Sequence, residues 1–174
     1  MRRGDQTKAM AEPAIQSNVN PIGLAIASGY TFVARGYAMA QPDLVDLIIR
    51  AMKHRGTAIL DILQPCPIYN DLMTIDFFRG SDVGQPRVYK LADEGFDGYV
   101  KDPQNPAEIV AKQQAAIAKS FEWGDRIPTG VLYQIDAPTY EDGLAARQPA
   151  LASSSLFDLM NPGKNIDALE DAYR

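Results

Sequence analysis

The feature that most constrains the fold is a strand–helix–strand pattern across residues 30–63. Residues 30–36, YTFVARG, are β-branched and aromatic and stop at a glycine, which is typical of a strand. Residues 41–56 place apolar side chains at helical spacing, between a proline near the start and a closing glycine. Residues 57–63, TAILDIL, are almost continuously apolar, as in a strand covered on both faces of a parallel sheet. The pattern predicts a βαβ unit with a right-handed crossover, and therefore an α/β fold.

The helix predicted at 41–56 has one apolar face, which consists of Leu44, Leu47, Ile48, Ala51 and Met52. Lys53, His54 and Arg55 follow in its last turn, where positive charge complements the helix dipole. We therefore interpret the only histidine of the chain as a helix-end residue rather than as a catalytic base.

The other predicted elements are helices at 20–29 and 105–123, a helix that begins at Thr139, and strands at 87–91 and 127–136. Asn20 and Asn105 are predicted N-caps, because each precedes a proline that suits the first helical turn. Residues 1–19 contain few apolar side chains, so we expect a poorly packed N-terminal segment. Residues 71–104 are rich in Gly, Asp and Pro and predict a long surface connection.

Composition excludes several classes of protein. A net charge of -5 disfavours binding to nucleic acid, since an acidic chain repels a phosphate backbone. No apolar run reaches about 18 residues, so no membrane span is expected. A single cysteine forms no internal disulfide and fits a reducing compartment. We therefore expect a cytoplasmic protein that binds neither nucleic acid nor a membrane.

The single cysteine, Cys66, stands between Pro65 and Pro67, directly after the strand predicted at 57–63. Ligands of parallel sheets bind at the carboxyl ends of strands, so the thiol lies where chemistry commonly occurs. Three interpretations of Cys66 remain open: a small buried apolar residue, a nucleophile, or a metal ligand. A cysteine followed by a proline also occurs among iron–sulfur ligands. With one Cys and one His, the chain does not complete a zinc site alone.

Two further groups of residues are placed near this edge. Tyr30 and Arg35 flank the strand predicted at 30–36, and each either lines a site or has a structural role. That role is packing for Tyr30 and a surface or interface salt bridge for Arg35. Tyr69, Asn70 and Asp71 follow the cysteine. The Asn and Asp side chains are expected to close the turn through bonds to nearby backbone, which needs no functional role.

The segments GYTFVARGYA and LIIRAMKHRGTAILDILQPCPIYND resemble the beta subunit of the 2-oxoacid:ferredoxin oxidoreductases. The resemblance begins near GDQTKAM, residues 4–10, and runs through Asp71, with a weaker similarity across 127–142. It implies membership of an enzyme family that oxidatively decarboxylates a 2-oxoacid, such as pyruvate or 2-oxoglutarate, to acyl-coenzyme A. The family uses thiamine diphosphate with Mg²⁺, and its electrons pass through an iron–sulfur cluster to ferredoxin.

The resemblance implies a specific role for Cys66, as the fourth ligand of a 4Fe-4S cluster whose other cysteines lie nearer the N-terminus of the subunit. Thr7 and Lys8 lie in the segment that follows the family's cofactor loop, and they are weak candidates for contacting thiamine or substrate. The family's Gly-Asp-Gly motif for magnesium and diphosphate has no counterpart in this chain, nor do the remaining cluster cysteines.

The resemblance therefore implies the C-terminal half of a thiamine-diphosphate-binding-type fold, with parallel-sheet βαβ units in residues 1–71 and a smaller α+β extension in 72–174. Such a chain is expected to be inactive alone and to complete no cofactor site. Its expected partners are the missing N-terminal half of the beta subunit, the alpha subunit and ferredoxin, with coenzyme A and a 2-oxoacid as substrates. The alternative is a truncated, non-catalytic α/β interaction module.

Overall fold

The computed structural model describes residues 2–148, which divide into two units between Ala137 and Pro138. In chain order the elements are α1 (Pro21–Ala27), β1 (Phe32–Tyr37), α2 (Gln41–Lys53), β2 (Ala58–Leu63), α3 (Ile75–Arg79), β3 (Val88–Lys90), a 3-10 turn η1 (Leu91–Glu94), α4 (Pro106–Ser120), β4 (Ile127–Gln134) and α5 (Tyr140–Arg147). All the helices and strands predicted from the sequence are present, with ends shifted by a few residues. No helix within residues 2–148 is long and apolar enough to cross a membrane.

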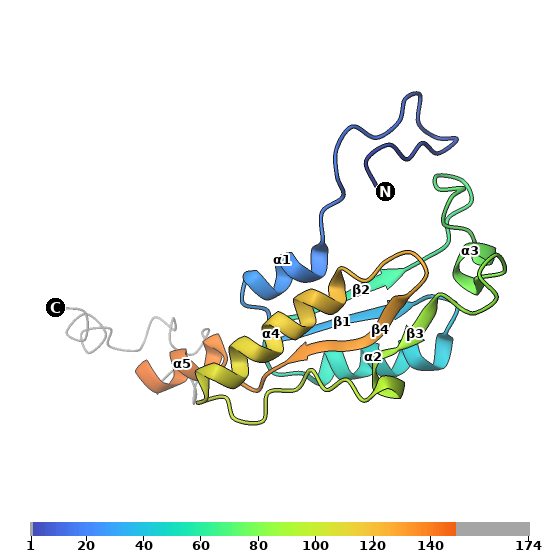
Figure 1. The fold of residues 1–174 in the computed structure, drawn as a ribbon. Coiled ribbons are helices and arrows are strands. Elements are labelled where there is room, and N and C mark those ends of the chain that lie inside the picture. Colours follow the sequence, from blue (N-terminus) through green and yellow to red (C-terminus); the bar gives the residue numbers. More distant parts are fainter. Residues whose placement is uncertain (1, 149–174) are drawn as a thin grey trace, which may run out of the picture. The chain divides into compact units, whose positions relative to one another are not determined.

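The first unit is built on one four-stranded sheet with the order β2-β1-β4-β3 (Figure 1). β1 and β2 are parallel and are joined through α2, which confirms the predicted βαβ unit. β3 and β4 are also parallel, whereas β1 and β4 run antiparallel. The sheet is therefore mixed, and it takes strands from both sides of the boundary predicted at residue 71, which stays a prediction.

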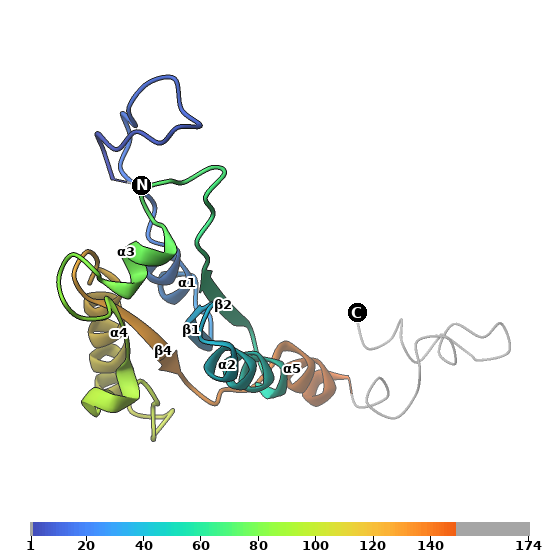
Figure 2. The same ribbon diagram turned by 90° about the vertical axis from the view of Figure 1, so that its right-hand side faces the viewer.

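Helices cover both faces of the sheet (Figures 1 and 2). The larger core lies on the face covered by α1 and α4, where Ile22 and Ala116 join Val33 and Leu132 of the strands. The smaller core lies under α2 and contains Phe32, Ala34 and Leu47. Alternate residues of β1 thus enter opposite cores, as the two-residue period of a strand requires.

Two sequence predictions about burial are wrong in part. The sequence predicts that β2 is covered on both faces, but its residues are at most half-buried and Ile62 is 44% exposed. Within residues 2–148, β2 is an edge strand of the sheet. Of the predicted apolar face of α2, Leu47 is buried, whereas Met52 is 80% exposed. The stretch 71–104 is also more than a surface connection, since it contains α3, β3 and η1 and buries Phe78 and Leu91 in the interior.

The predicted N-caps Asn20 and Asn105 are confirmed, and we expect the cap of α4 to stabilise the fold. The Asn105 side-chain oxygen accepts hydrogen bonds from the backbone N–H groups of Ala107 and Glu108, at 3.1 and 3.3 Å. Asn105→Ala removes both acceptors and is expected to lower the free energy of unfolding by about 1 kcal/mol. The control is Gln104→Ala at an exposed neighbouring side chain, expected to change it by less than about 0.5 kcal/mol. Urea unfolding followed by circular dichroism compares them, and equal losses would contradict the capping role.

Candidate functional site

Cys66 lies just past the carboxyl end of β2, at the edge of the sheet where the sequence predicted it. Its side chain is half-buried, and its backbone carbonyl accepts a hydrogen bond from Asn70 N–H at 2.8 Å. Because β1 and β2 are parallel, both strands end at this edge. The thiol is thus free, partly accessible and held in a compact turn.

The turn after Cys66 is closed by Asn70, as predicted. The Asn70 Oδ1 atom accepts hydrogen bonds from the backbone N–H groups of Leu72 and Met73, both at 3.1 Å. An Asn side chain that bonds backbone two and three residues ahead fixes the local chain direction. Tyr69 stays largely exposed. Prolines before and after Cys66 restrict the backbone further, so the direction of the thiol is constrained from both sides.

Asp71 makes a contact that the sequence did not reveal. Its Oδ1 accepts a hydrogen bond from the backbone N–H of Lys8 at 3.0 Å, across 63 positions of sequence. The N-terminal segment and the loop after β2 therefore lie side by side, as both ribbon views show (Figures 1 and 2). No local signal indicates such a bond, because Asn and Asp in a turn ordinarily bond their own loop.

The same contact brings Thr7 and Lys8 beside the Cys66 turn. Lys8 is exposed, whereas Thr7 is only 3% exposed. The Thr7 hydroxyl has no hydrogen-bond partner among residues 2–148. A buried hydroxyl without a hydrogen-bond partner is unusual in proteins.

The Asp71–Lys8 contact predicts a pH dependence. The hydrogen bond from the Lys8 N–H stabilises the charged carboxylate and lowers the pKa of Asp71 below its usual value of 3.8. The contact is therefore complete above the usual Asp pKa and is lost as the pH falls through the lowered one. In an NMR titration, the Lys8 amide resonance should shift with a midpoint below pH 3.8. Asp71→Asn should abolish that transition, and a midpoint at or above the usual Asp value would contradict the contact.

Arg35 and Tyr30 have different surroundings in the structure. Tyr30 packs against the larger core, and it lies before β1 begins, away from Cys66, so its structural interpretation is confirmed. Arg35 lies within β1 opposite Asp61 of β2, and its Nε donates to Asp61 Oδ2 at 2.8 Å. The predicted salt bridge of Arg35 is therefore confirmed, but Arg35 is buried and does not lie on the surface. The pair also borders a cavity of about 400 Å³ near the N-terminal segment.

His54 lies at the end of α2 as the sequence predicted, but as the residue that follows the last turn, which ends at Lys53. It is the C-cap residue of α2, and its Nε2 lies 2.8 Å from the Thr31 hydroxyl oxygen. Burial lowers the pKa of His54, and the nearby Asp136 carboxylate partly opposes that shift. Neither Cys66 nor Asp71 borders the cavity next to it, so His54 is not placed to act as a base for the thiol.

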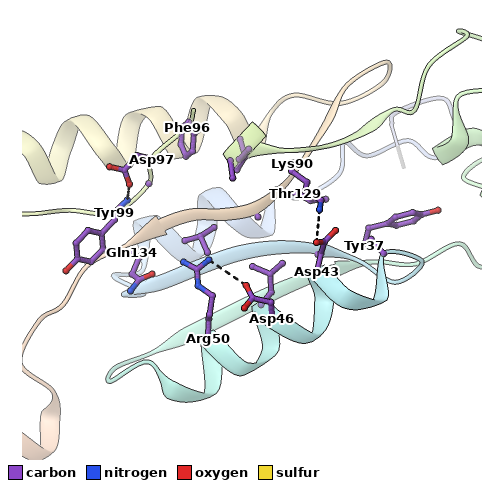
Figure 3. A pocket seen from close by; sticks show the side chains of 18 residues that line it. Tyr37, Asp43, Asp46, Arg50, Lys90, Phe96, Asp97, Tyr99, Thr129 and Gln134 are labelled. Atoms are coloured by element: carbon purple, nitrogen blue, oxygen red, sulfur yellow. Dashed lines mark hydrogen bonds and ion pairs between the residues drawn. The ribbon is translucent and has the colours of Figure 1, made fainter. Parts of the chain in front are cut away.

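A second cavity, of about 270 Å³, lies between α2 and β4 (Figure 3). Its charged side chains are largely paired with one another: Lys90 contacts Asp43 at 2.8 Å, and Arg50 contacts Asp46 at 3.9 Å. Asp97, at the other end, pairs with Lys112 outside the cavity. This cavity contains neither Cys66 nor Thr7 nor Lys8, and its paired charges present no free catalytic group. Sequence patterns do not reveal it, because its walls come from segments that meet only in the folded sheet.

Comparison with known proteins decides the family. Residues 66–148 match the family model that describes the C-terminal part of the pyruvate ferredoxin oxidoreductase beta chain. The 2-oxoacid:ferredoxin oxidoreductase subunit beta of Saccharolobus solfataricus is 47% identical over 178 aligned positions, which cover 100% of this chain and 55% of that relative. This chain belongs to the 2-oxoacid:ferredoxin oxidoreductase beta-subunit family.

Further relatives are similar over most of this chain. Subunit beta of 2-oxoacid:ferredoxin oxidoreductase 1 from Aeropyrum pernix is 45% identical, over 86% of this chain and 45% of its own length. The 2-oxoglutarate oxidoreductase subunit KorB of Mycobacterium tuberculosis is 27% identical, over 86% of this chain and 46% of its own. The chain thus spans about half the length of the curated relatives it matches.

A solved structure supports the fold. A chain of the 2-oxoglutarate:ferredoxin oxidoreductase from Magnetococcus marinus, solved with 2-oxoglutarate, coenzyme A and succinyl-CoA bound, superposes with a TM-score of 0.67. The match covers 99% of this chain and 50% of that one, at 23% sequence identity. The α/β architecture of this beta-subunit-family chain is therefore shared with a known oxidoreductase.

The described residues of this family member form no metal site by themselves. The whole chain contains one cysteine and one histidine. Within residues 2–148, no group of three or more His, Cys, Asp or Glu side chains is arranged to hold a metal ion. A 4Fe-4S cluster held by cysteines takes four thiolates, and this chain contains a single cysteine.

Proposed function

We propose that this chain forms part of the beta subunit of a 2-oxoacid:ferredoxin oxidoreductase and that Cys66 donates one thiolate to a shared 4Fe-4S cluster. The observation that carries the proposal is the proline-flanked free thiol at the carboxyl end of β2, in a chain 47% identical to a named beta subunit. The complete enzyme oxidatively decarboxylates a 2-oxoacid, pyruvate or 2-oxoglutarate, to acyl-coenzyme A. The electrons released pass through the cluster to ferredoxin.

The geometry of the Cys66 turn suits a ligand role. A thiolate ligand must keep a fixed direction, and here Asn70 and the two prolines limit the freedom of the turn. The half-buried position suits a cluster, since burial shapes its reduction potential. A nucleophilic role has less support, because the only histidine lies at the end of α2 and does not activate this thiol.

The segment around Thr7 and Lys8 is proposed to face the thiamine diphosphate. When bound with Mg²⁺, that cofactor supplies the stabilised carbanion for decarboxylation. The chain's own contribution is positional: the hydrogen bond between Lys8 N–H and Asp71 joins the proposed cofactor-facing segment to the loop that follows the Cys66 turn. The unpartnered Thr7 hydroxyl is consistent with a segment whose remaining contacts come from another part of the subunit.

The partners follow from what the chain does not supply. Three further cluster ligands and the magnesium motif are proposed to come from the N-terminal half of a complete beta subunit. An alpha subunit helps to form the thiamine site, and ferredoxin accepts the electrons in the cytoplasm. The chain alone is therefore proposed to be inactive.

Reconstitution tests this proposal. The full chain is produced together with the N-terminal half of a relative's beta subunit and the matching alpha subunit, without oxygen. We expect reduction of a viologen dye that depends on both the 2-oxoacid and coenzyme A, and no reduction when any one protein is omitted. If all the components assemble with thiamine diphosphate and a full cluster but neither 2-oxoacid supports dye reduction, the proposal is wrong. That result would favour the alternative, a non-catalytic interaction module.

A further inference from the structure

We propose that the cavity beside Arg35 is a binding site for a carboxylate group. The cavity measures about 400 Å³ and lies where the N-terminal segment, the start of α1 and the end of α4 meet the β1–β2 pair. Cys66, Thr7 and Lys8 do not line it, and it is separate from the cavity of Figure 3. The inference rests on side chains of this chain and does not depend on the oxidoreductase activity.

The Arg35 guanidinium is incompletely hydrogen-bonded. Arg35 is only 3% exposed. Within residues 2–148, its guanidinium makes one hydrogen bond, from Nε to Asp61 at 2.8 Å. Its Nη1 is buried and has no hydrogen-bond partner within residues 2–148. A guanidinium carries five N–H donors in a planar fork, and a buried charged donor without an acceptor is strongly unfavourable. The site therefore lacks an acceptor.

The charge of the cavity selects a monoanion. The charged side chains that line the cavity are Arg2, Arg35 and Asp61, two positive and one negative. One added negative charge balances this set. A phosphate dianion would overcompensate it and be repelled more strongly by Asp61. The planar fork of Arg35 binds either anion, so charge is what favours a carboxylate.

The cavity wall is partly apolar. Trp123, Phe121 and Met73 provide apolar surface, and the Arg35 guanidinium carbon lies 5.8 Å from the Trp123 ring centre. A carboxylate with a small apolar body therefore fits better than a fully polar anion. Nη1 is closed off from solvent, so the ligand reaches it with a local shift of the wall. Arg2, which lines the cavity from the N-terminal segment, is exposed.

The test uses Trp123, the only tryptophan of the chain, as a fluorescent reporter inside the cavity. The full 174-residue chain is titrated with isobutyrate, with the isosteric neutral isobutyramide, and with inorganic phosphate. Isobutyrate should give a saturable change, and the other two should bind at least about tenfold more weakly. Arg35→Lys keeps the charge beside Asp61 but loses the fork, and should weaken isobutyrate binding at least about tenfold. Arg50→Lys, in the other cavity, should leave it unchanged.

Each outcome either supports or overturns the carboxylate site. Equal binding of isobutyrate and isobutyramide, or no saturable change, overturns the proposal without any variant. Equal binding by wild type and by Arg35→Lys with intact circular dichroism overturns the role of Arg35. The carboxylate has two possible sources, which the assembled complex distinguishes. Isobutyrate binding that persists there indicates a small-molecule ligand, and binding lost on assembly indicates an Asp or Glu of a neighbouring chain; either result supports a carboxylate site.

Discussion

Asp61→Ala is expected to lower the free energy of unfolding by about 3 kcal/mol, because it leaves the Arg35 charge buried without a counter-ion. Arg35 and Asp61 face each other in the β1–β2 register and are joined by a 2.8 Å hydrogen bond. Removing one partner of a buried ion pair typically costs about 3–5 kcal/mol. The Asp61 side chain is 22% exposed, which places the expected value at the lower end.

A matched ion pair on the surface provides the control. Asp46 pairs with Arg50 at 3.9 Å, and the Asp46 side chain is 67% exposed. Asp46→Ala should change the free energy of unfolding by less than about 0.5 kcal/mol, since exposed pairs contribute little. Both variants are compared with wild type by urea unfolding at neutral pH. Similar small losses for the two would mean that the Arg35 charge is solvated and not buried.

Leu132→Ala is expected to cost about 3 kcal/mol through a cavity in the larger core. Leu132 lies on β4, has no solvent-exposed surface, and packs with Ile22 of α1 and Ala116 of α4. Truncating the Leu132 side chain therefore weakens the packing of α1 and α4 against the sheet.

Leu24→Ala is the control for the core variant, because Leu24 lies on the exposed side of α1. It should change the free energy of unfolding by less than about 0.5 kcal/mol. Urea unfolding monitored by circular dichroism measures both variants. A loss below about 1 kcal/mol for Leu132→Ala would contradict the proposed core, since deletion of a well-packed leucine costs more.

Local signals in the sequence predicted the elements well, for physical reasons. Helix ends follow from caps, and the Asn20, Asn105 and Thr139 side chains each bond the first turn of their helix. The βαβ unit follows from the switch between two-residue and helical apolar spacing. The position of Cys66 was predictable because a turn that directly follows a strand must lie at the edge of the sheet.

The contacts between distant segments were not predictable in the same way. The insertion of β4 between β1 and β3 depends on packing of the whole sheet, which local spacing does not encode. The Asp71–Lys8 bond joins residues 63 positions apart, and turn chemistry pointed to a local partner instead. The exposure of Met52 was not predictable because helical spacing shows which residues share a face but not what covers it.

Several features of the described residues lack a partner. Within residues 2–148, β2 is an edge strand, the Thr7 hydroxyl and Arg35 Nη1 have no hydrogen-bond partner, and Cys66 is a free thiol. The chain spans about half the length of its relatives.

The central claim is that Cys66 is a cluster ligand, and one measurement tests it directly. The reconstituted complex is prepared without oxygen with wild-type chain, with Cys66→Ala, and with Pro67→Ala, which keeps the thiol. Iron content and the electron paramagnetic resonance spectrum of the dithionite-reduced complex are then recorded. We expect a 4Fe-4S signal in the wild type and in Pro67→Ala, and its loss or conversion to a lower-iron cluster in Cys66→Ala. An unchanged spectrum and iron content in assembled Cys66→Ala complex would contradict the account.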